Sequence, residues 1–169
     1  MGQVPAVDPQ QKKGPWMSAL AWSARQRPVT WFLVNVGNKI DPYLMKATGG
    51  RVRSTLNGPT VLLTHTGAKS GKKRSTPLAY FTDGDDVVMI ASRGGHADHP
   101  AWYFNVRANP EVELWTHGGG GRYRAREAEG DEREHLWKLA TTMYPGFASY
   151  QERAGERRIP VIVCSPQDD

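Results

Sequence analysis

The sequence is poor in several features that mark whole classes of protein. Its 169 residues include one cysteine, Cys164, so no intrachain disulfide can form and a reducing compartment is allowed. That thiol follows an apolar run, which predicts a buried, unreactive side chain. No uninterrupted apolar run reaches the roughly 18–20 residues that a helix needs to span a bilayer. The chain also opens without an apolar segment and small-residue cleavage site, so we expect a cytoplasmic protein.

The usual nucleotide and catalytic signatures are also lacking. No G-x-G-x-x-G follows a strand-like run, so a dinucleotide fold is unsupported. A P-loop needs four residues between its glycines, whereas Gly67 and Gly71 are separated by three. No serine lies in a G-x-S-x-G elbow, which argues against a serine hydrolase. His96 and His99 have no cysteine nearby and one close carboxylate, so we predict no metal site.

Acidic residues are outnumbered by basic ones, 17 against 22, and the formal net charge is +5. This excess favours an anionic partner, but nucleic acid, an acidic membrane surface and an anionic cofactor all satisfy it. A nucleic-acid surface would interleave aromatic and basic side chains on one open face. The late tyrosines lie far from the lysines along the sequence, so we expect no nucleic-acid partner.

Composition divides the chain into three parts. Residues 1–15 are polar with three prolines and predict a flexible arm. Residues 16–50 carry tryptophans and apolar residues at helical spacing, which predicts an N-terminal helical region. That region either covers the sheet of its own domain or of a partner subunit, or lies on an anionic bilayer. Residues 51–169 change to strand-like periods and predict the main domain.

About six short strands are predicted in this domain, with short helices between them. The hairpin turn Asp83-Gly84-Asp85 joins the second and third strands, and Pro100–Ala108 is predicted as a helix. Gly118–Gly121 predicts a long flexible hairpin tip, and Asp131 with Glu134 predicts a helix cap. A second short helical region is predicted over residues 144–153. The absence of βαβ alternation makes the fold mainly β (α+β), a small barrel and not a parallel sheet.

Two basic, glycine-bearing turns each follow a strand-like run. They read Gly-Ala-Lys-Ser-Gly-Lys-Lys-Arg over residues 67–74 and Ser-Arg-Gly-Gly over residues 92–95. Glycine lets backbone N–H groups converge on a ligand, and lysine and arginine add positive charge. At the ends of neighbouring strands, two such turns would cradle a long anionic ligand. The alternative for the first turn is a solvated surface loop.

Aromatic residues recur late in the chain. Tyr144, Phe147 and Tyr150 are three residues apart and share one face of a helical turn. Such a face either belongs to the core or forms the wall of a pocket for a flat ring, where a tyrosine can donate a hydrogen bond or a proton. His65 lies within a strand-like run and is expected to be a packed or hydrogen-bonded imidazole.

From about Pro59 to Cys164 the chain resembles the deazaflavin-dependent nitroreductases of actinobacteria. The motifs that carry this resemblance are LLTHTGAKSGKKRSTPL, IASRGG, HPAWYFNVRANP, TMYPGFASYQ and RRIPVIVC. The resemblance implies a split β-barrel and a reduced 8-hydroxy-5-deazaflavin, coenzyme F-420, as the cofactor. It also implies hydride transfer to a quinone, menaquinone-like, or to a nitroaromatic acceptor.

The resemblance assigns roles to individual residues. It implies that Lys69, Ser70 and Arg74 hold the phosphate and acidic tail of the coenzyme. The remaining cofactor-binding residues that it implies are Pro77, Ser92, Arg93, Gly94, Gly95, Trp102 and Tyr103. The substrate pocket would comprise Tyr144, Phe147 and Tyr150, with Tyr144 as the catalytic donor that stabilises developing negative charge.

Three residues depart from the family pattern. Ala68 stands where some relatives carry a basic residue, Arg93 replaces lysine, and Phe147 stands where a relative has tyrosine. The last change puts nitroimidazole reduction in doubt more than coenzyme binding. Two other functions stay open: a non-catalytic carrier of the same coenzyme, and an FMN-dependent oxidoreductase of a related barrel. Expected partners are the small-molecule acceptor, a second copy of the chain, and a membrane surface met through the N-terminal helix.

Overall fold

The computed structural model describes residues 3–10 and 59–167. The elements within these ranges are six strands, three α-helices and one short 3-10 helix. In chain order they are β1 (Thr60–Thr66), β2 (Lys73–Asp83), β3 (Asp86–Ile90), η2 (Arg93–Gly95), α4 (Ala101–Ala108), β4 (Glu111–Thr116), β5 (Gly119–Glu127), α5 (Gly130–Met143), α6 (Gly146–Ala154) and β6 (Val161–Pro166). The helical region predicted over residues 16–50 lies outside the described residues.

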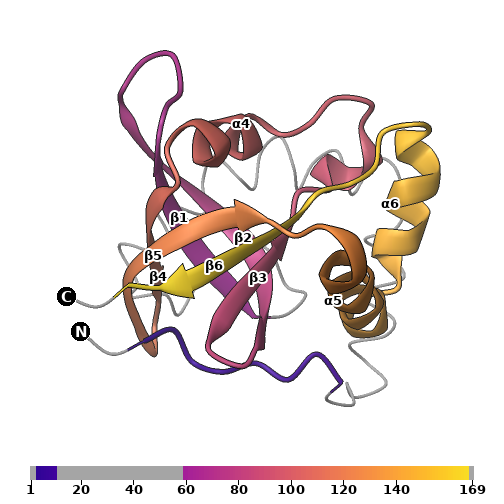
Figure 1. Cartoon of the computed structure of the whole chain (residues 1–169), viewed down its shortest axis with the longest axis horizontal. Coiled ribbons are helices and arrows are strands. Elements are labelled where there is room, and N and C mark those ends of the chain that lie inside the picture. The colour runs from indigo at the N-terminus through magenta and orange to yellow at the C-terminus, as the bar shows by residue number, and fades with distance from the viewer. Residues whose placement is uncertain (1–2, 11–58, 168–169) are drawn as a thin grey trace.

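The six strands close into one antiparallel barrel in the order β1-β2-β3-β6-β5-β4 (Figure 1). The predicted mainly-β barrel of about six strands is therefore confirmed. The tight turn at Gly84 is also as predicted, because Asp83 pairs with Asp86 across the β2–β3 hairpin. Among the described residues, no helix is long and apolar enough to cross a membrane.

Two clusters of buried side chains hold the barrel together. The first fills the barrel interior with alternate residues of the strands, such as Leu63, Met89 and Tyr123, and α4 closes one end with Trp102. The second lies outside β3 and β6, where α5 and α6 cover residues such as Val88 (Figure 1). Strands β3 and β6 are thus buried on both faces, which explains why their sequences are continuous apolar runs.

The prediction of a flexible tip at Gly118–Gly121 was wrong. Gly119 pairs with Thr116 and Gly120 with Trp115, so the hairpin turns within two residues and three glycines belong to β5. A side chain at Gly120 would collide with the Leu114 carbonyl oxygen and lie 2.9 Å from the Trp115 Cα atom. Glycine is required here because the two backbones approach closely, and not because the tip is mobile.

The predicted cap of α5 was also wrong, although the helix itself was confirmed. The N-cap residue is Glu129, and its side chain makes no capping hydrogen bond. The Glu134 carboxylate instead accepts hydrogen bonds from Arg133 and Arg158. The apolar face of α5 is turned inward, because Leu136, Ala140 and Met143 are buried.

Residues 3–10 differ from the flexible arm that their composition suggested. The Val4 amide donates to the Tyr123 hydroxyl at 3.0 Å, and the Tyr80 hydroxyl donates to the Pro5 carbonyl at 3.1 Å. Val7 and Thr82 exchange backbone and side-chain hydrogen bonds. This segment, drawn in indigo in Figure 1, therefore runs along the barrel and buries Val4 in its core.

Candidate active site

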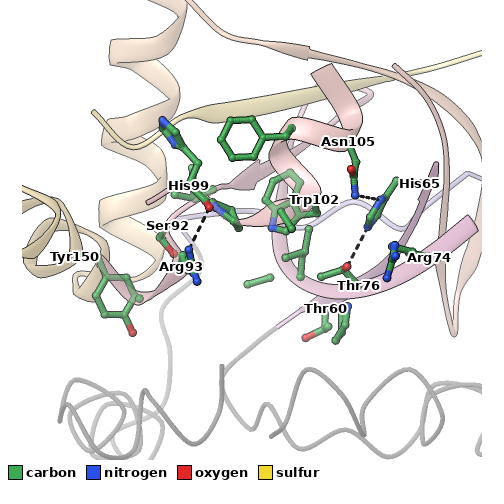
Figure 2. A pocket seen from close by; sticks show the side chains of 18 of the residues that line it. Thr60, His65, Arg74, Thr76, Ser92, Arg93, His99, Trp102, Asn105 and Tyr150 are labelled. Carbon is green, nitrogen blue, oxygen red and sulfur yellow. Dashed lines mark hydrogen bonds between the residues drawn. The ribbon is translucent and has the colours of Figure 1, made fainter. Parts of the chain in front are cut away.

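A cavity of about 1180 Å³ opens between α4, the ends of the first strands and the aromatic side chains around α6. Eleven predicted site residues line it: Lys69, Ser70, Arg74, Pro77, Ser92, Arg93, Gly94, Trp102, Tyr144, Phe147 and Tyr150. Figure 2 shows Arg74 at one end of the cavity and Arg93 with Tyr150 at the other. The fold thus gathers three motifs that lie far apart in the sequence around one space.

The first basic turn is a closed six-residue loop between β1 and β2. The Gly67 amide donates to the Lys72 carbonyl at 2.9 Å, and the Gly71 amide donates to the Gly67 carbonyl at 2.8 Å. The Ala68 amide donates to Asn105 Oδ1 at 2.9 Å, which ties the turn to α4. A Cβ atom on Gly67 would lie 2.6 Å from Ser70 Oγ and 3.6 Å from Arg74 Nε, so these groups crowd against the bare backbone.

The cavity wall is positively charged. Its lining, as far as the structure describes it, includes Lys69, Arg74 and Arg93 but no carboxylate. Within the described ranges, neither Lys69 nor Arg74 forms an ion pair, and both are exposed. Two unpaired cations on one short hairpin attract an anionic group by Coulomb interaction and offer it several hydrogen-bond donors.

The second basic turn has an unusual backbone. Arg93, Gly94 and Gly95 have φ values of 49°, 62° and 81°, and Arg93 is the one non-glycine residue with positive φ in the described part of the chain. A non-glycine residue in this region is sterically disfavoured and persists only when its surroundings hold it. Here Gly95 packs directly on α6, where a Cβ atom would lie 2.6 Å from the Tyr150 carbonyl oxygen.

Arg157 holds this turn in place. Its guanidinium donates to the carbonyl oxygens of Ser92 at 2.7 Å and His96 at 2.9 Å, and also to that of Ala91 at 3.3 Å. It also lies 3.2 Å from Nδ1 of His99, which must accept because guanidinium can only donate. Burial and then the nearby Arg157 lower the pKa of His99, which favours the neutral ring required for that bond.

The late aromatic residues form a cluster at the cavity. The Tyr144 and Phe147 rings meet edge to face with centroids 5.2 Å apart, and the Tyr144 and Tyr150 hydroxyl oxygens are 3.3 Å apart. Phe147 and Tyr150 are buried by the second core cluster, while Tyr144 is half-buried. Both interpretations of this face therefore hold, because it is packed against the core and also lines the pocket.

The comparison with family models decides which proteins the chain is related to. Residues 39–166 match the model of the F420H(2)-dependent quinone reductase family. The chain belongs to this family.

Individual relatives agree with that assignment. The F420H(2)-dependent quinone reductase Rv1261c of Mycobacterium tuberculosis is 35% identical over 127 residues, which cover 72% of this chain and 85% of the relative. A solved F420-H2 dependent reductase, FDR-A, is 49% identical with a TM-score of 0.59, covering 63% of this chain and 94% of the other. A second structure, described as a domain-swapped dimer, is 41% identical with a TM-score of 0.61 and covers 82% of this chain and 99% of the other.

Two residues assigned to the cofactor by resemblance do not line the cavity in this quinone reductase family member. Gly95 is buried against the α6 backbone at Tyr150. The Tyr103 hydroxyl donates to Glu127 Oε2 at 2.8 Å and accepts from Arg107 at 3.2 Å, so it points away from the cavity. The Tyr103 and His99 rings pack against each other at a tilt of 35°, with centroids 4.6 Å apart, so Tyr103 supports the wall from behind.

Other lining residues were not singled out from the sequence of this family member. Asn105 and Thr76 line the cavity, and both are hydrogen-bonded to the buried His65. His65 was expected to be packed or hydrogen-bonded, and this is confirmed, but its contact with the cavity was missed. A polar residue at every second position of β2 (Arg74, Thr76) was the available signal.

The remaining titratable candidates are structural. Cys164 is buried, and burial raises the pKa of its thiol to about 12, as expected for an inert cysteine. Within residues 3–10 and 59–167, no group of three histidine, cysteine, aspartate or glutamate side chains is placed to bind a metal ion.

Proposed function

We propose that this protein transfers a hydride from reduced coenzyme F-420 to a quinone of the menaquinone class. The observation that carries the proposal is one cavity with an aromatic wall at one end and, at the other, cations that form no ion pair within the described residues. The family assignment supports both the coenzyme and the quinone. When bound, the reduced coenzyme supplies the hydride, and the protein supplies binding, orientation and electrostatics.

The charged end fits the acidic part of the coenzyme. Lys69, Ser70 and Arg74 all line the cavity, and Ser70 comes between the two cations in the sequence of the turn. A phosphate or carboxylate placed there would receive charge-assisted hydrogen bonds without having to displace a carboxylate of the described chain. The anion would therefore fix one end of a long ligand.

The size and lining of the cavity fit two flat rings. Pockets for one drug-sized ligand occupy about 300–1,000 Å³, and the volume here is about 1180 Å³. Trp102, Ile90 and Phe147 supply apolar surface, and Gly94 lets the backbone approach a ring closely. A donor ring and an acceptor ring can then lie against each other in this one cavity.

Tyr144 is the proposed catalytic donor. A quinone that accepts a hydride develops negative charge on its oxygen, and a hydrogen-bond donor held nearby stabilises that charge. Tyr144 lies at the pocket with its hydroxyl near that of Tyr150, so the pair can share the donor role. A proton from solvent completes the reduction to the hydroquinone. We extend the acceptor range to nitroaromatic compounds, which are flat and electrophilic in the same way.

We also propose that the protein acts at the inner face of the cell membrane, through residues 16–50, and as a homo-oligomer. Menaquinone-like acceptors reside in membranes, and the basic, tryptophan-rich composition of this region suits an anionic surface. Co-sedimentation of the full chain with phosphatidylglycerol vesicles, compared with neutral vesicles, tests the first point. Light scattering of the purified protein tests the second.

The decisive assay follows the absorbance of reduced coenzyme F-420 during incubation with the protein and menadione. The proposal predicts protein-dependent oxidation with multiple turnovers. Binding without oxidation, across a panel of quinones and nitro compounds, would identify a coenzyme carrier instead. Tight binding of FMN in place of the deazaflavin would assign the protein to the flavin-dependent barrels.

A further inference from the structure

A line of hydrogen bonds runs from the backbone of the first basic turn to a hydroxyl at the cavity. The Ala68 amide meets Asn105 Oδ1 at 2.9 Å, and Asn105 Nδ2 lies 3.2 Å from His65 Nδ1. His65 Nε2 lies 3.1 Å from the Thr76 hydroxyl oxygen. Figure 2 shows the last two contacts as dashed lines, with Asn105 on α4 above His65 and Thr76 below it.

The direction of every bond in this line follows from its first member. A backbone N–H can only donate, so the Asn105 atom that it meets is the carbonyl oxygen and the other is the NH₂ group. That NH₂ group must donate to His65 Nδ1, which leaves the proton of a neutral imidazole on Nε2. Nε2–H then donates to Thr76, whose oxygen is the acceptor of this bond.

The imidazole is held neutral by its surroundings. His65 is 3% exposed, and burial followed by the nearby Arg74 lowers its pKa to about 4. A charged ring would carry protons on both nitrogens and would oppose the Asn105 NH₂ group. The neutral Nε2–H tautomer is therefore the form that satisfies both hydrogen-bond partners of the ring, Asn105 and Thr76.

These bond directions determine which way the hydrogen of the Thr76 hydroxyl can point. Because its oxygen accepts from His65, this hydrogen is available to another acceptor, and none lies within hydrogen-bonding distance in the part of the chain that the structure describes. Thr76 lines the cavity and is half-buried. We infer that Thr76 is a specificity-determining donor that binds an oxygen acceptor of the ligand, with its direction fixed by Asn105 and His65.

The position of Thr76 indicates which acceptor this is. Arg74, Thr76 and Leu78 are alternate residues of β2 that all line the cavity, so charged, polar and apolar groups follow one another along one strand face. Thr76 is about 7 Å from Arg74 along the strand. On the proposed function, Arg74 would hold the acidic end of the coenzyme, and Thr76 would offer its hydroxyl hydrogen to a carbonyl oxygen of the coenzyme ring. Both the coenzyme ring and the quinone carry carbonyl oxygens that could accept from Thr76, and we assign the acceptor to the coenzyme.

The direction of the hydrogen bonds in this line can be tested without any ligand. Two-bond ¹H–¹⁵N correlation spectra of the purified protein distinguish the protonated from the unprotonated nitrogen of each histidine, and loss of a signal in His65→Gln assigns His65. We expect a protonated Nε2 and an unprotonated Nδ1 from pH 5.5 to 8. A proton on Nδ1, or a doubly protonated ring at pH 7, would overturn the inference whatever the coenzyme assays show.

The donor itself is tested by paired substitutions. Thr76→Val removes the hydroxyl while keeping the shape, and Thr76→Ser keeps the hydroxyl. We expect Thr76→Val to weaken binding of oxidised coenzyme F-420 about tenfold by fluorescence titration, because a ligand oxygen is left without a donor, and Thr76→Ser to restore most of the loss. Thermal unfolding of both variants checks that they remain folded.

The outcomes separate this inference from the proposed function. If wild-type protein binds the coenzyme and Thr76→Val binds it equally well with an unchanged KM for menadione, the donor role is wrong while the function stands. A raised KM for menadione at unchanged coenzyme affinity would overturn the assignment to the coenzyme. The oxygen that accepts from Thr76 would then belong to the quinone. If the wild-type protein binds no coenzyme, the proposed function fails, and the spectra of His65 still decide the direction of these hydrogen bonds.

Discussion

Acidification is expected to destabilise this protein through His65 in particular. The folded protein buries the ring as a neutral hydrogen-bonded group with a pKa of about 4, whereas the ordinary value for histidine is 6.5. In the unfolded chain the ring takes up a proton as the pH falls below about 6.5. The unfolded state therefore binds more protons between these two values, and the free energy of unfolding falls as the pH falls.

The size of the effect follows from the two pKa values. At about 1.36 kcal/mol per pH unit, the full loss below pH 4 is about 3 kcal/mol. At pH 4.5, where the folded ring is still mostly neutral, the loss relative to pH 7.5 is about 2.5 kcal/mol. This is a large part of the 5–15 kcal/mol by which domains are usually stable.

Urea unfolding at pH 7.5 and pH 4.5 measures this loss of stability, provided that the contribution of the other titrating groups is subtracted. His65→Gln serves as the control, because glutamine does not titrate while the rest of the chain is unchanged. We expect the wild-type protein to lose about 2.5 kcal/mol more than His65→Gln between the two pH values. Equal losses in the two proteins would show that the ring is not held neutral and would refute the reasoning.

Three further substitutions have defined outcomes. Arg74→Ala should weaken coenzyme binding about tenfold at low salt and less at high salt. Arg124→Ala removes the same charge outside the cavity and should not weaken binding. Equal effects of the two substitutions on the affinity measured by calorimetry would count against an anion site at the turn. Tyr144→Phe should lower turnover with menadione more than coenzyme affinity, and unchanged turnover would remove Tyr144 from the mechanism. Gly120→Ala should lower stability by about 2 kcal/mol or more, because its Cβ atom would collide with the neighbouring backbone. Gly121→Ala should not, since among the described residues its Cβ atom would meet only Tyr123, at 4.0 Å. Similar melting temperatures of the two variants would contradict the close approach.

The barrel was predictable because hydrophobic period and turn chemistry agree along most of the chain. The expected number of strands was found, and Pro100 stands at the start of α4 as expected. The four-glycine stretch led to a wrong prediction of a flexible tip, because glycine occurs both in mobile loops and where two backbones approach closely. Local sequence does not contain the partner strand, so it could not show that Leu114 and Trp115 leave no room for side chains.

The candidate site was predictable from its charged and aromatic motifs but not from its polar connections. The resemblance supplied eleven residues that line the cavity, among them Arg74 and Tyr144. It also supplied Tyr103, whose hydroxyl is used up by Glu127 on a distant strand. The Asn105–His65–Thr76 hydrogen bonds join α4 to two strands. These residues are of ordinary types and lie far apart in the sequence, so nothing in the sequence indicates that they contact one another.

Calorimetric titration of the purified protein with oxidised coenzyme F-420 tests the central claim most directly. The account predicts one site per chain, affinity in the micromolar range or better, and weaker binding as salt is added, because cations of the first basic turn hold the acidic end of the coenzyme. No detectable heat at micromolar protein and coenzyme, or binding that is indifferent to salt, would contradict it.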